Sequence, residues 1–112
     1  MNVSITVVDT AFGRPAEGAE VALLREVDAS WRHEASAHTD EAGRVVIQRD
    51  APALGRYRLV VDLDRYFASL GATSLQSRVD ITFRAFRHDR SIPFIVSVTP
   101  SSFSVLRVSA HD

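Results

Sequence analysis

The sequence predicts an all-β protein, an antiparallel sandwich of about eight short strands with one short helix. Three observations favour this class. Apolar and polar residues alternate with period two in most segments of the chain. Turn-forming residues separate those segments at intervals of about 8–12 residues. Only one segment, residues 64–71, carries start and stop signals of a helix.

The expected strands follow one another along the whole chain. They are residues 2–9, 20–27, 31–39, 44–49, 56–63, 78–86, 91–99 and 103–110. Residues 10–18 contain Gly13, Pro15 and Gly18 and are expected to form a loop. Residues 91–99 are apolar at nearly every position. A lone sandwich needs only one apolar face, so this strand suggests an oligomer interface.

The helix is expected between two capping residues. Asp64 is a suitable N-cap and Gly71 a suitable C-terminal stop. The intervening segment makes only about two turns, which is too short to be stable alone. We therefore expect Tyr66, Phe67 and Leu70 to hold it by packing on the sheets.

Composition places the chain among ordinary globular proteins. Its 112 residues have a formal net charge of −1, a hydrophobic fraction of 46% and a charged fraction of 24%. We expect one domain spanning residues 1–112. The near-neutral charge argues against a nucleic-acid partner. There is no apolar run of roughly 18 residues for a membrane span, and residues 1–9 lack the features of a signal peptide. A cytoplasmic protein is the simplest expectation.

Two residue types are missing, and each absence excludes chemistry. Without cysteine there is no disulfide, thiol nucleophile or cysteine metal site. All 13 basic residues are arginine, so Schiff-base catalysis and a lysine-bearing phosphate loop are excluded. The use of arginine without lysine favours a GC-rich, bacterial genome.

The histidines do not predict a metal centre. His33 and His38 have odd spacing on one expected strand, which would place them on opposite faces. His88 lies in an expected turn and His111 near the end of the chain. No pair has helical ligand spacing, so neither a metal nor another cofactor is expected. Aromatic residues expected in the core or at an interface are Trp31, Phe83, Phe86 and Phe94.

Several motifs in collinear order resemble the transthyretin-like family, which includes the 5-hydroxyisourate hydrolases of purine catabolism. They are residues 8–16 (VDTAFGRPA), 39–44 (TDEAGR), 57–67 and 92–100. The resemblance implies an eight-stranded sandwich with one short helix. It also implies a homotetramer, in which two subunits join their sheets edge to edge and two such dimers meet face to face. The ligand site would lie in the channel between the dimers.

The hydrolases of this family are similar to one another at four places. Here the first histidine position is Thr6, the arginine after the turn glycine is Arg44, and the second histidine position is Ser91. The Tyr-Arg-Gly-Ser tail of the hydrolases is Leu-Arg-Val-Ser at residues 106–109. Both histidines are therefore replaced by hydroxyl residues, which do not titrate near neutral pH as imidazole does. These replacements argue against hydroxyisourate hydrolysis.

The candidate site residues follow from these positions. The expected substrate-binding residues are Thr6, Arg44, Ser91, Arg107 and Ser109, and the expected catalytic residues are Arg44 and Asp89. Arg44 offers a planar fork of donors to a carbonyl or anionic oxygen. Asp89 lies two residues before Ser91, so on a continuing strand both side chains would face the channel. The alternatives are a solvated turn residue for Arg44 and a hairpin-capping carboxylate for Asp89, with Thr6 and Ser91 filling space.

Three functions remain open at this point. The first is a repurposed, cofactor-free enzyme that acts on a small organic molecule by ring opening, cyclisation or isomerisation, for example in specialised biosynthesis. The second is a non-catalytic binder or scaffold, as transthyretin is. The third is 5-hydroxyisourate hydrolysis by an altered site. The sequence identifies neither the substrate nor the pathway.

Overall fold

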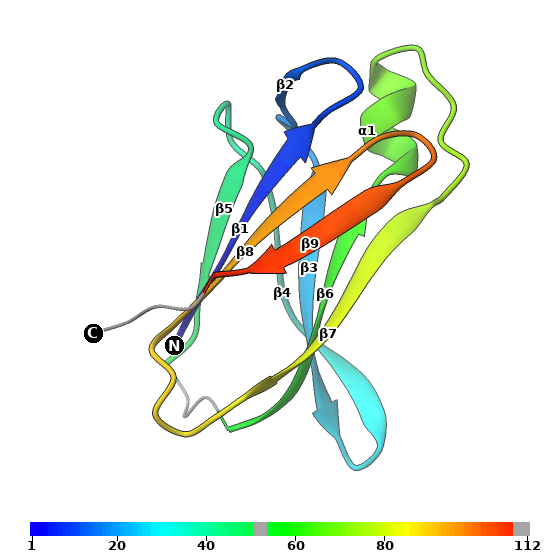
Figure 1. The fold of residues 1–112 in the computed structure, drawn as a ribbon. Helices are drawn as coiled ribbons and strands as arrows, with labels where there is room; N and C mark the ends of the chain where they lie inside the picture. The colour runs from blue at the N-terminus through cyan, green and yellow to red at the C-terminus, as the bar shows by residue number, and fades with distance from the viewer. Residues whose placement is uncertain (51–53, 109–112) are drawn as a thin grey trace.

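The computed structural model describes residues 1–50 and 54–108, which form a sandwich of two β-sheets with a short helix at one end (Figure 1). The strands are β1 (Asn2–Asp9), β2 (Arg14–Pro15), β3 (Glu20–Val27), β4 (Ser30–His38), β5 (Arg44–Gln48), β6 (Gly55–Asp62), β7 (Arg78–Ala85), β8 (Ser91–Val98) and β9 (Phe103–Arg107), and the helix is α1 (Asp64–Ser69). The predicted all-β class is confirmed. The structure has one strand that the sequence did not predict, the two-residue β2, which lies inside the loop expected at residues 10–18.

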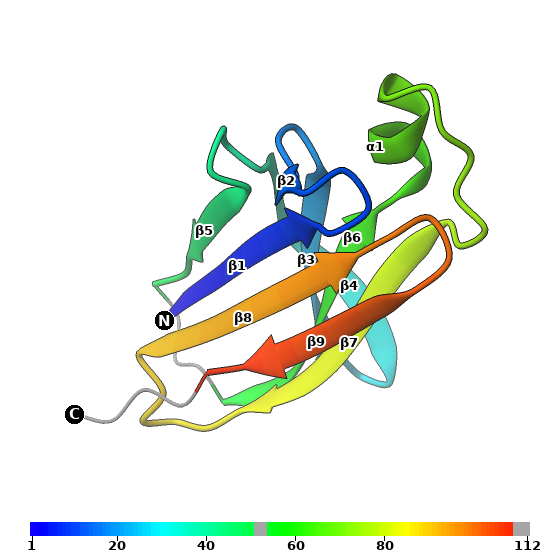
Figure 2. The ribbon, with the colours of Figure 1, turned by 45° about the horizontal axis from the view of Figure 1, so that its top comes forward.

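The first sheet, which we call sheet A, has the order β2-β1-β8-β9, and β5 also pairs with β1 (Figure 2). Here the expected antiparallel arrangement is wrong for one pair. β1 and β8 run parallel over their full length, from Asn2 opposite Ser91 to Asp9 opposite Val98. All other pairs in the sheet are antiparallel. The second sheet, sheet B, is antiparallel throughout, with the order β4-β3-β6-β7.

The core lies between the two sheets and follows from the period-two pattern. In β1, β6, β7 and β8, every second residue is buried. Phe83 on β7 joins the two layers, because its ring lies 5.6 Å from that of Tyr57 and 5.1 Å from that of Phe94. The prediction of a core position is thus confirmed for Phe83 and Phe94. Phe86, in contrast, is 49% exposed.

The helix ends as predicted but begins differently. The N-terminal cap position is Leu63, which makes no side-chain capping bond, and Asp64 is the first helical residue. The backbone N–H of Arg65 instead donates to the Asp62 carboxylate at 3.1 Å. Asp62 can do this because β6 ends there and the chain turns directly into the helix. At the other end Gly71 has a φ of +75°, and its N–H donates to the Ala68 carbonyl.

A buried hydrogen-bond cluster ties α1 to the end of β1. Asp9 is fully buried, and its Oδ1 accepts the N–H groups of Ala11 and Phe12 at 3.0 and 2.9 Å. Its Oδ2 accepts the hydroxyl of Tyr66 at 2.8 Å. Burial, and then the hydrogen bond to the Asp9 carboxylate, raise the pKa of Tyr66 to about 12. The signature residues 8–16 therefore have a structural role at this point.

A β-bulge overturns the predicted placement of the histidines. Leu23 lies opposite Ala35 but Leu24 lies opposite His33, so one extra residue of β4 is inserted there. His38 lies opposite Glu20. Glu20 and Leu24 both alternate away from the core, and His33 and His38 therefore share the outer face of sheet B. The expectation of opposite faces assumed an unbroken strand.

Candidate functional site

Two of the candidate residues lie directly opposite each other on the outer face of sheet A. Thr6 of β1 pairs with Arg44 of β5 in the antiparallel register. Residues that are paired in this way have side chains on the same face, with Cβ atoms about 4.5–5.5 Å apart. The neighbours of Thr6 in β1, Ile5 and Val7, are buried, which confirms that Thr6 points away from the core.

A tight turn fixes the backbone position of Arg44. The Asp40 carboxylate accepts the N–H groups of Ala42 and Arg44 at 2.9 and 3.0 Å. Gly43 between them has a φ of +75°, and a Cβ there would collide with the carbonyl oxygen of Val7. Only glycine therefore fits this turn, which sets the backbone position of the residue that follows it, Arg44. The side chain of Arg44 is exposed and makes no ion pair within residues 1–50 and 54–108.

Ser91 lies on the same face but farther along the sheet. It is the first residue of β8 and is exposed, opposite Asn2. Thr6 lies opposite Ile95, four residues later in β8. At a rise of about 3.3 Å per residue, this separates Ser91 from the Thr6 level by about 13 Å. Within one subunit, Thr6 and Ser91, which stand where the hydrolases have histidines, are therefore not in contact with each other.

Apolar side chains surround Thr6 and Arg44, and most of them were not singled out from the sequence. Exposed ones on this face are Val46 (50%), Ile95 (39%), Leu106 (59%) and Val108 (40%). Ile95 pairs with Leu106, and the N–H of Val108 donates to the Pro93 carbonyl at 3.0 Å. The apolar character of residues 91–99 was the available signal for Ile95. No sequence signal identifies Val46, because its place on this face follows only from the β1–β5 register.

The structure separates Arg107 from Arg44. Arg107 of β9 pairs with the buried Phe94, so it lies on the inner side of sheet A, at the edge of the sandwich. Its Nη1 donates to the Arg84 carbonyl at 3.4 Å, and its Nη2 lies 3.9 Å from Oδ2 of Asp89. The two arginines of one subunit therefore do not face a common ligand.

Asp89 also departs from its expected position. β8 begins at Ser91, so Asp89 belongs to the turn before the strand. Its Oδ2 accepts the N–H of Phe86 at 2.7 Å, and its own N–H donates to the Phe86 carbonyl at 2.9 Å. This geometry corresponds to the hairpin-capping alternative. The expectation that Asp89 and Ser91 face one channel assumed that the strand continued backwards through the turn.

The remaining candidate, Ser109, lies outside the described residues. Among the residues that are described, no group of three or more His, Asp or Glu side chains is arranged to hold a metal ion. No helix in the same part of the chain is long and apolar enough to cross a membrane. The candidate site is thus the outer face of sheet A, where an arginine and hydroxyl groups lie among apolar side chains.

Comparison with known proteins decides the family. Residues 3–107 match the model of the HIUase/Transthyretin family. The chain belongs to this family. Its similarity to the 5-hydroxyisourate hydrolase of Salmonella typhimurium is 27% identity over 99 residues, which are 85% of this chain and 73% of that protein.

Solved structures of the HIUase/Transthyretin family agree with the fold. Klebsiella pneumoniae 5-hydroxyisourate hydrolase matches with a TM-score of 0.83 at 29% identity, over 96% of this chain and 98% of that one. Sea bream transthyretin, solved in complex with thyroxine, matches with a TM-score of 0.89 over 98% of both chains. At 22% identity, this second likeness concerns the fold alone.

Proposed function

We propose that this protein is a divergent member of the HIUase/transthyretin family that acts on a small organic molecule on the outer face of sheet A. The proposed reaction is a cofactor-free ring opening, cyclisation or isomerisation. The observation that carries the proposal is the Thr6–Arg44 pair among exposed apolar side chains. An arginine without a carboxylate partner among the described residues is free to bind a ligand oxygen.

Each residue has a definite task in this proposal. The guanidinium of Arg44 donates two parallel hydrogen bonds to a carboxylate, enolate or imide oxygen and stabilises negative charge that develops there. The hydroxyl of Thr6 donates or accepts one further hydrogen bond beside it. Val46, Ile95 and Leu106 cover the apolar part of the ligand and exclude water. Ser91, which lies about 13 Å farther along the same face within one subunit, lines the far end of this surface rather than the Thr6–Arg44 pair.

The face needs a cover, which we propose is another copy of the chain. Exposed apolar residues on one face of a sheet are typical of an interface. β7 and β9 are the edge strands on one side of the two sheets, and their outer edges are unpaired within the described residues. A homotetramer would pair these edges and bring two outer faces together around the ligand. Light scattering should show a tetramer, and a stable monomer at micromolar concentration would contradict this arrangement.

A non-catalytic binder is the second candidate, and one observation favours it. The outward polar side chains of β1, β5, β8 and β9 on this face carry hydroxyl, amide or guanidinium groups and no imidazole or carboxylate; they are Asn2, Ser4, Thr6, Arg44, Gln48, Ser91, Ser97 and Ser104. Such a face can hold a ligand without moving protons. The third candidate is hydroxyisourate hydrolysis, which the 27% identity to the Salmonella typhimurium enzyme supports.

The first experiment separates these candidates by activity. Freshly generated hydroxyisourate is followed by its ultraviolet absorbance with and without the protein. We expect no acceleration, because both histidine positions carry hydroxyl residues. Rapid decay proportional to protein concentration would favour the hydrolase candidate instead.

The second experiment tests Arg44 once a ligand has been found by screening small carboxylates and cyclic imides. Arg44→Ala should weaken binding or transition-state stabilisation by about 1.5–3 kcal/mol, which corresponds to about 10- to 150-fold. Arg44→Lys should recover part of this loss, because lysine keeps the charge but not the planar fork. Arg65→Ala, an exposed arginine on α1, is the matched control. An Arg44→Ala protein that binds and turns over as the parent does would reduce Arg44 to a solvated turn residue.

A further inference from the structure

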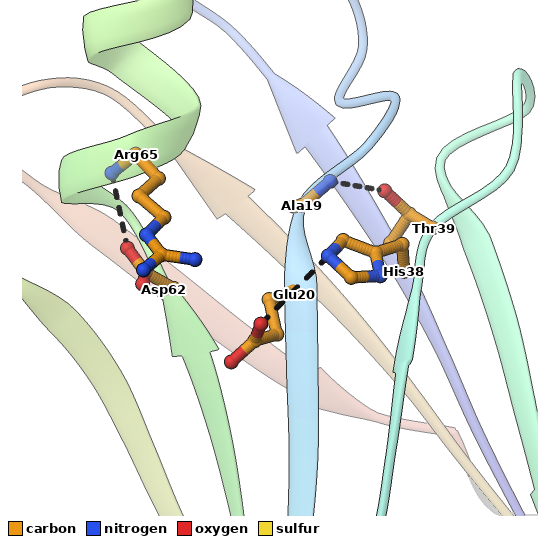
Figure 3. Close-up of polar contacts among 6 residues, drawn as sticks. All are labelled: Ala19, Glu20, His38, Thr39, Asp62 and Arg65. Carbon is orange, nitrogen blue, oxygen red and sulfur yellow. Dashed lines mark hydrogen bonds and ion pairs between the residues drawn. The ribbon is translucent and has the colours of Figure 1, made fainter.

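The outer face of sheet B, opposite to the proposed ligand face, divides into two ends of different charge. Near α1 the outward residues are mainly acidic, and Figure 3 shows Glu20 and Asp62 there, with His38 Nε2 3.7 Å from Glu20 Oε2. At the far end of the same strands the outward residues are mainly arginines. Because the net charge of the chain is only −1, this separation reflects positions in the sheet rather than composition.

Five outward residues form what we call the basic cluster. They are Trp31 on β4, Arg56 and Arg58 on β6, and Thr82 and Arg84 on β7. In the register, Arg56 lies opposite Arg84, and Arg58 lies opposite Thr82. Arg58 and Arg84 are therefore diagonal neighbours about 7–8 Å apart, a distance that long side chains span.

Trp31 holds the arginines of β6 in place. The guanidinium carbon of Arg58 lies 4.3 Å from the centroid of the indole ring, and that of Arg56 lies 5.9 Å from it. The Nε atom of Arg58 is buried and has no hydrogen-bond partner among the described residues. Arg58 is thus fixed by stacking and not by a carboxylate.

Charge in the basic cluster is only partly compensated. Arg56 forms an ion pair with Glu26 at 2.9 Å. Within the described residues, Arg58 and Arg84 have no such partner. Like charges directly opposite on neighbouring strands, as Arg56 and Arg84 are, destabilise the pair. An anion between the strands would remove this repulsion.

A strained two-residue turn precedes Trp31 and fixes the register of Trp31 in the hairpin. Asp28 and Ala29 both have positive φ values, 52° and 62°, which alanine adopts only at a cost. This two-residue turn sets Trp31 opposite Glu26. The indole is therefore held at the register that places it beneath the two guanidinium groups.

We propose that the basic cluster binds a tetrahedral oxyanion of the phosphate type between Arg58 and Arg84. Each guanidinium donates hydrogen bonds to the anion, and the hydroxyl of Thr82, which lies opposite Arg58, donates one more. Two uncompensated positive charges match a dianion better than a monocarboxylate. The site lies on the other sheet from Arg44, so it is independent of the function proposed above.

The test uses Trp31 as the reporter, because it is the only tryptophan of the chain. The full-length protein is titrated with inorganic phosphate at constant ionic strength maintained with chloride, and tryptophan emission is recorded. We expect a saturable change, and phosphate should also raise the melting temperature. Parallel titrations with a simple phosphate monoester distinguish free phosphate from a phosphorylated organic ligand. Acetate should give no saturation.

Two variants locate the site. Arg84→Gln should weaken phosphate binding by about tenfold or more without lowering the melting temperature, because it removes a repulsive charge. Arg78→Gln, at the acidic end of the same strand, is the control and should bind as the parent does. The proposal is overturned if phosphate gives no saturable signal, if acetate gives the same response, or if Arg84→Gln keeps full affinity. Calorimetry of both variants confirms the result without relying on fluorescence.

Discussion

Replacing Tyr66 by phenylalanine tests how much the hydrogen bond between α1 and the end of β1 contributes to the free energy of unfolding. The substitution removes the hydroxyl that donates to Asp9 at 2.8 Å and leaves the ring in place. Asp9 is fully buried, so the oxygen that loses this partner gains no water in return. We therefore expect a loss of stability and little change in packing.

The hydrogen bond itself gives the size of this loss. A hydrogen bond to a charged group contributes about 1.5–3 kcal/mol. We expect Tyr66→Phe to lower the free energy of unfolding by about 1.5–2.5 kcal/mol. At about 4 °C per kcal/mol, the melting temperature would fall by about 6–10 °C.

The effect of pH has a defined sign. The folded protein holds the Tyr66 proton more tightly than the unfolded chain does, since the pKa is higher in the fold. This stabilisation is complete below about pH 10 and is lost as the pH rises from 10 to about 12. The difference in stability between the parent and Tyr66→Phe should therefore shrink across this window.

Urea unfolding from about pH 9 to about pH 11.5, at one protein concentration, measures this difference. Tyr57→Phe is the matched control, because Tyr57 is equally buried but its hydroxyl makes no hydrogen bond to another described residue. This control should change stability by less than about 0.5 kcal/mol. A Tyr66→Phe protein as stable as the parent, or a difference that stays constant with pH, would refute the reasoning.

Three further predictions concern turns and the candidate site. Gly43→Ala should cost at least about 2 kcal/mol in urea unfolding, because its Cβ collides with the Val7 carbonyl and its φ is positive. Ala29→Gly should raise the free energy of unfolding by about 0.5–1 kcal/mol, since glycine adopts the positive φ of 62° without strain; an unchanged or lower value would argue against strain in this hairpin. Thr6→His should not give rapid decay of hydroxyisourate absorbance, because Ser91 still replaces the second histidine. If it did, one histidine would be sufficient for the reaction.

The sequence predicts the strands well because burial alternates regularly. Residues 2–9 and 20–27 begin and end where expected, and most other strand ends differ by one or two residues. The last strand was expected at residues 103–110; β9 is Phe103–Arg107, and the end of the expected strand, residues 109–110, lies outside the described residues. The helix start was misplaced because two aspartates lie close together. Asp62 and Asp64 fit a capping signal about equally, and only the backbone geometry shows that Asp62 accepts the hydrogen bond.

The β-bulge was not predictable from local sequence. No glycine or proline marks residues 30–38, so an unbroken strand was the natural expectation. The bulge appears only when β4 is paired with β3. Its effect is large, because it moves His33 and Trp31 to the outer face.

The candidate site was predictable only in part, because side-chain faces depend on pairing. Thr6 and Arg44 are 38 positions apart in sequence, and only the β1–β5 register brings them together. The face of Arg107 depends in the same way on its pairing with Phe94. Asp89 shows the opposite case, since its capping role is local and is one of the two interpretations that the sequence supports.

The parallel pairing of β1 with β8 has a consequence for how the chain reaches its fold. During synthesis β1 emerges before the other described strands, yet its parallel partner β8 begins only at Ser91. The four strands of sheet B are all made before β8, since β7 ends at Ala85. β1 can meanwhile pair only with β2 and β5, with its other edge open. A chain interrupted before β8 would therefore carry a long unpaired edge rich in valine and isoleucine, which makes nascent or truncated chains the form most prone to aggregate.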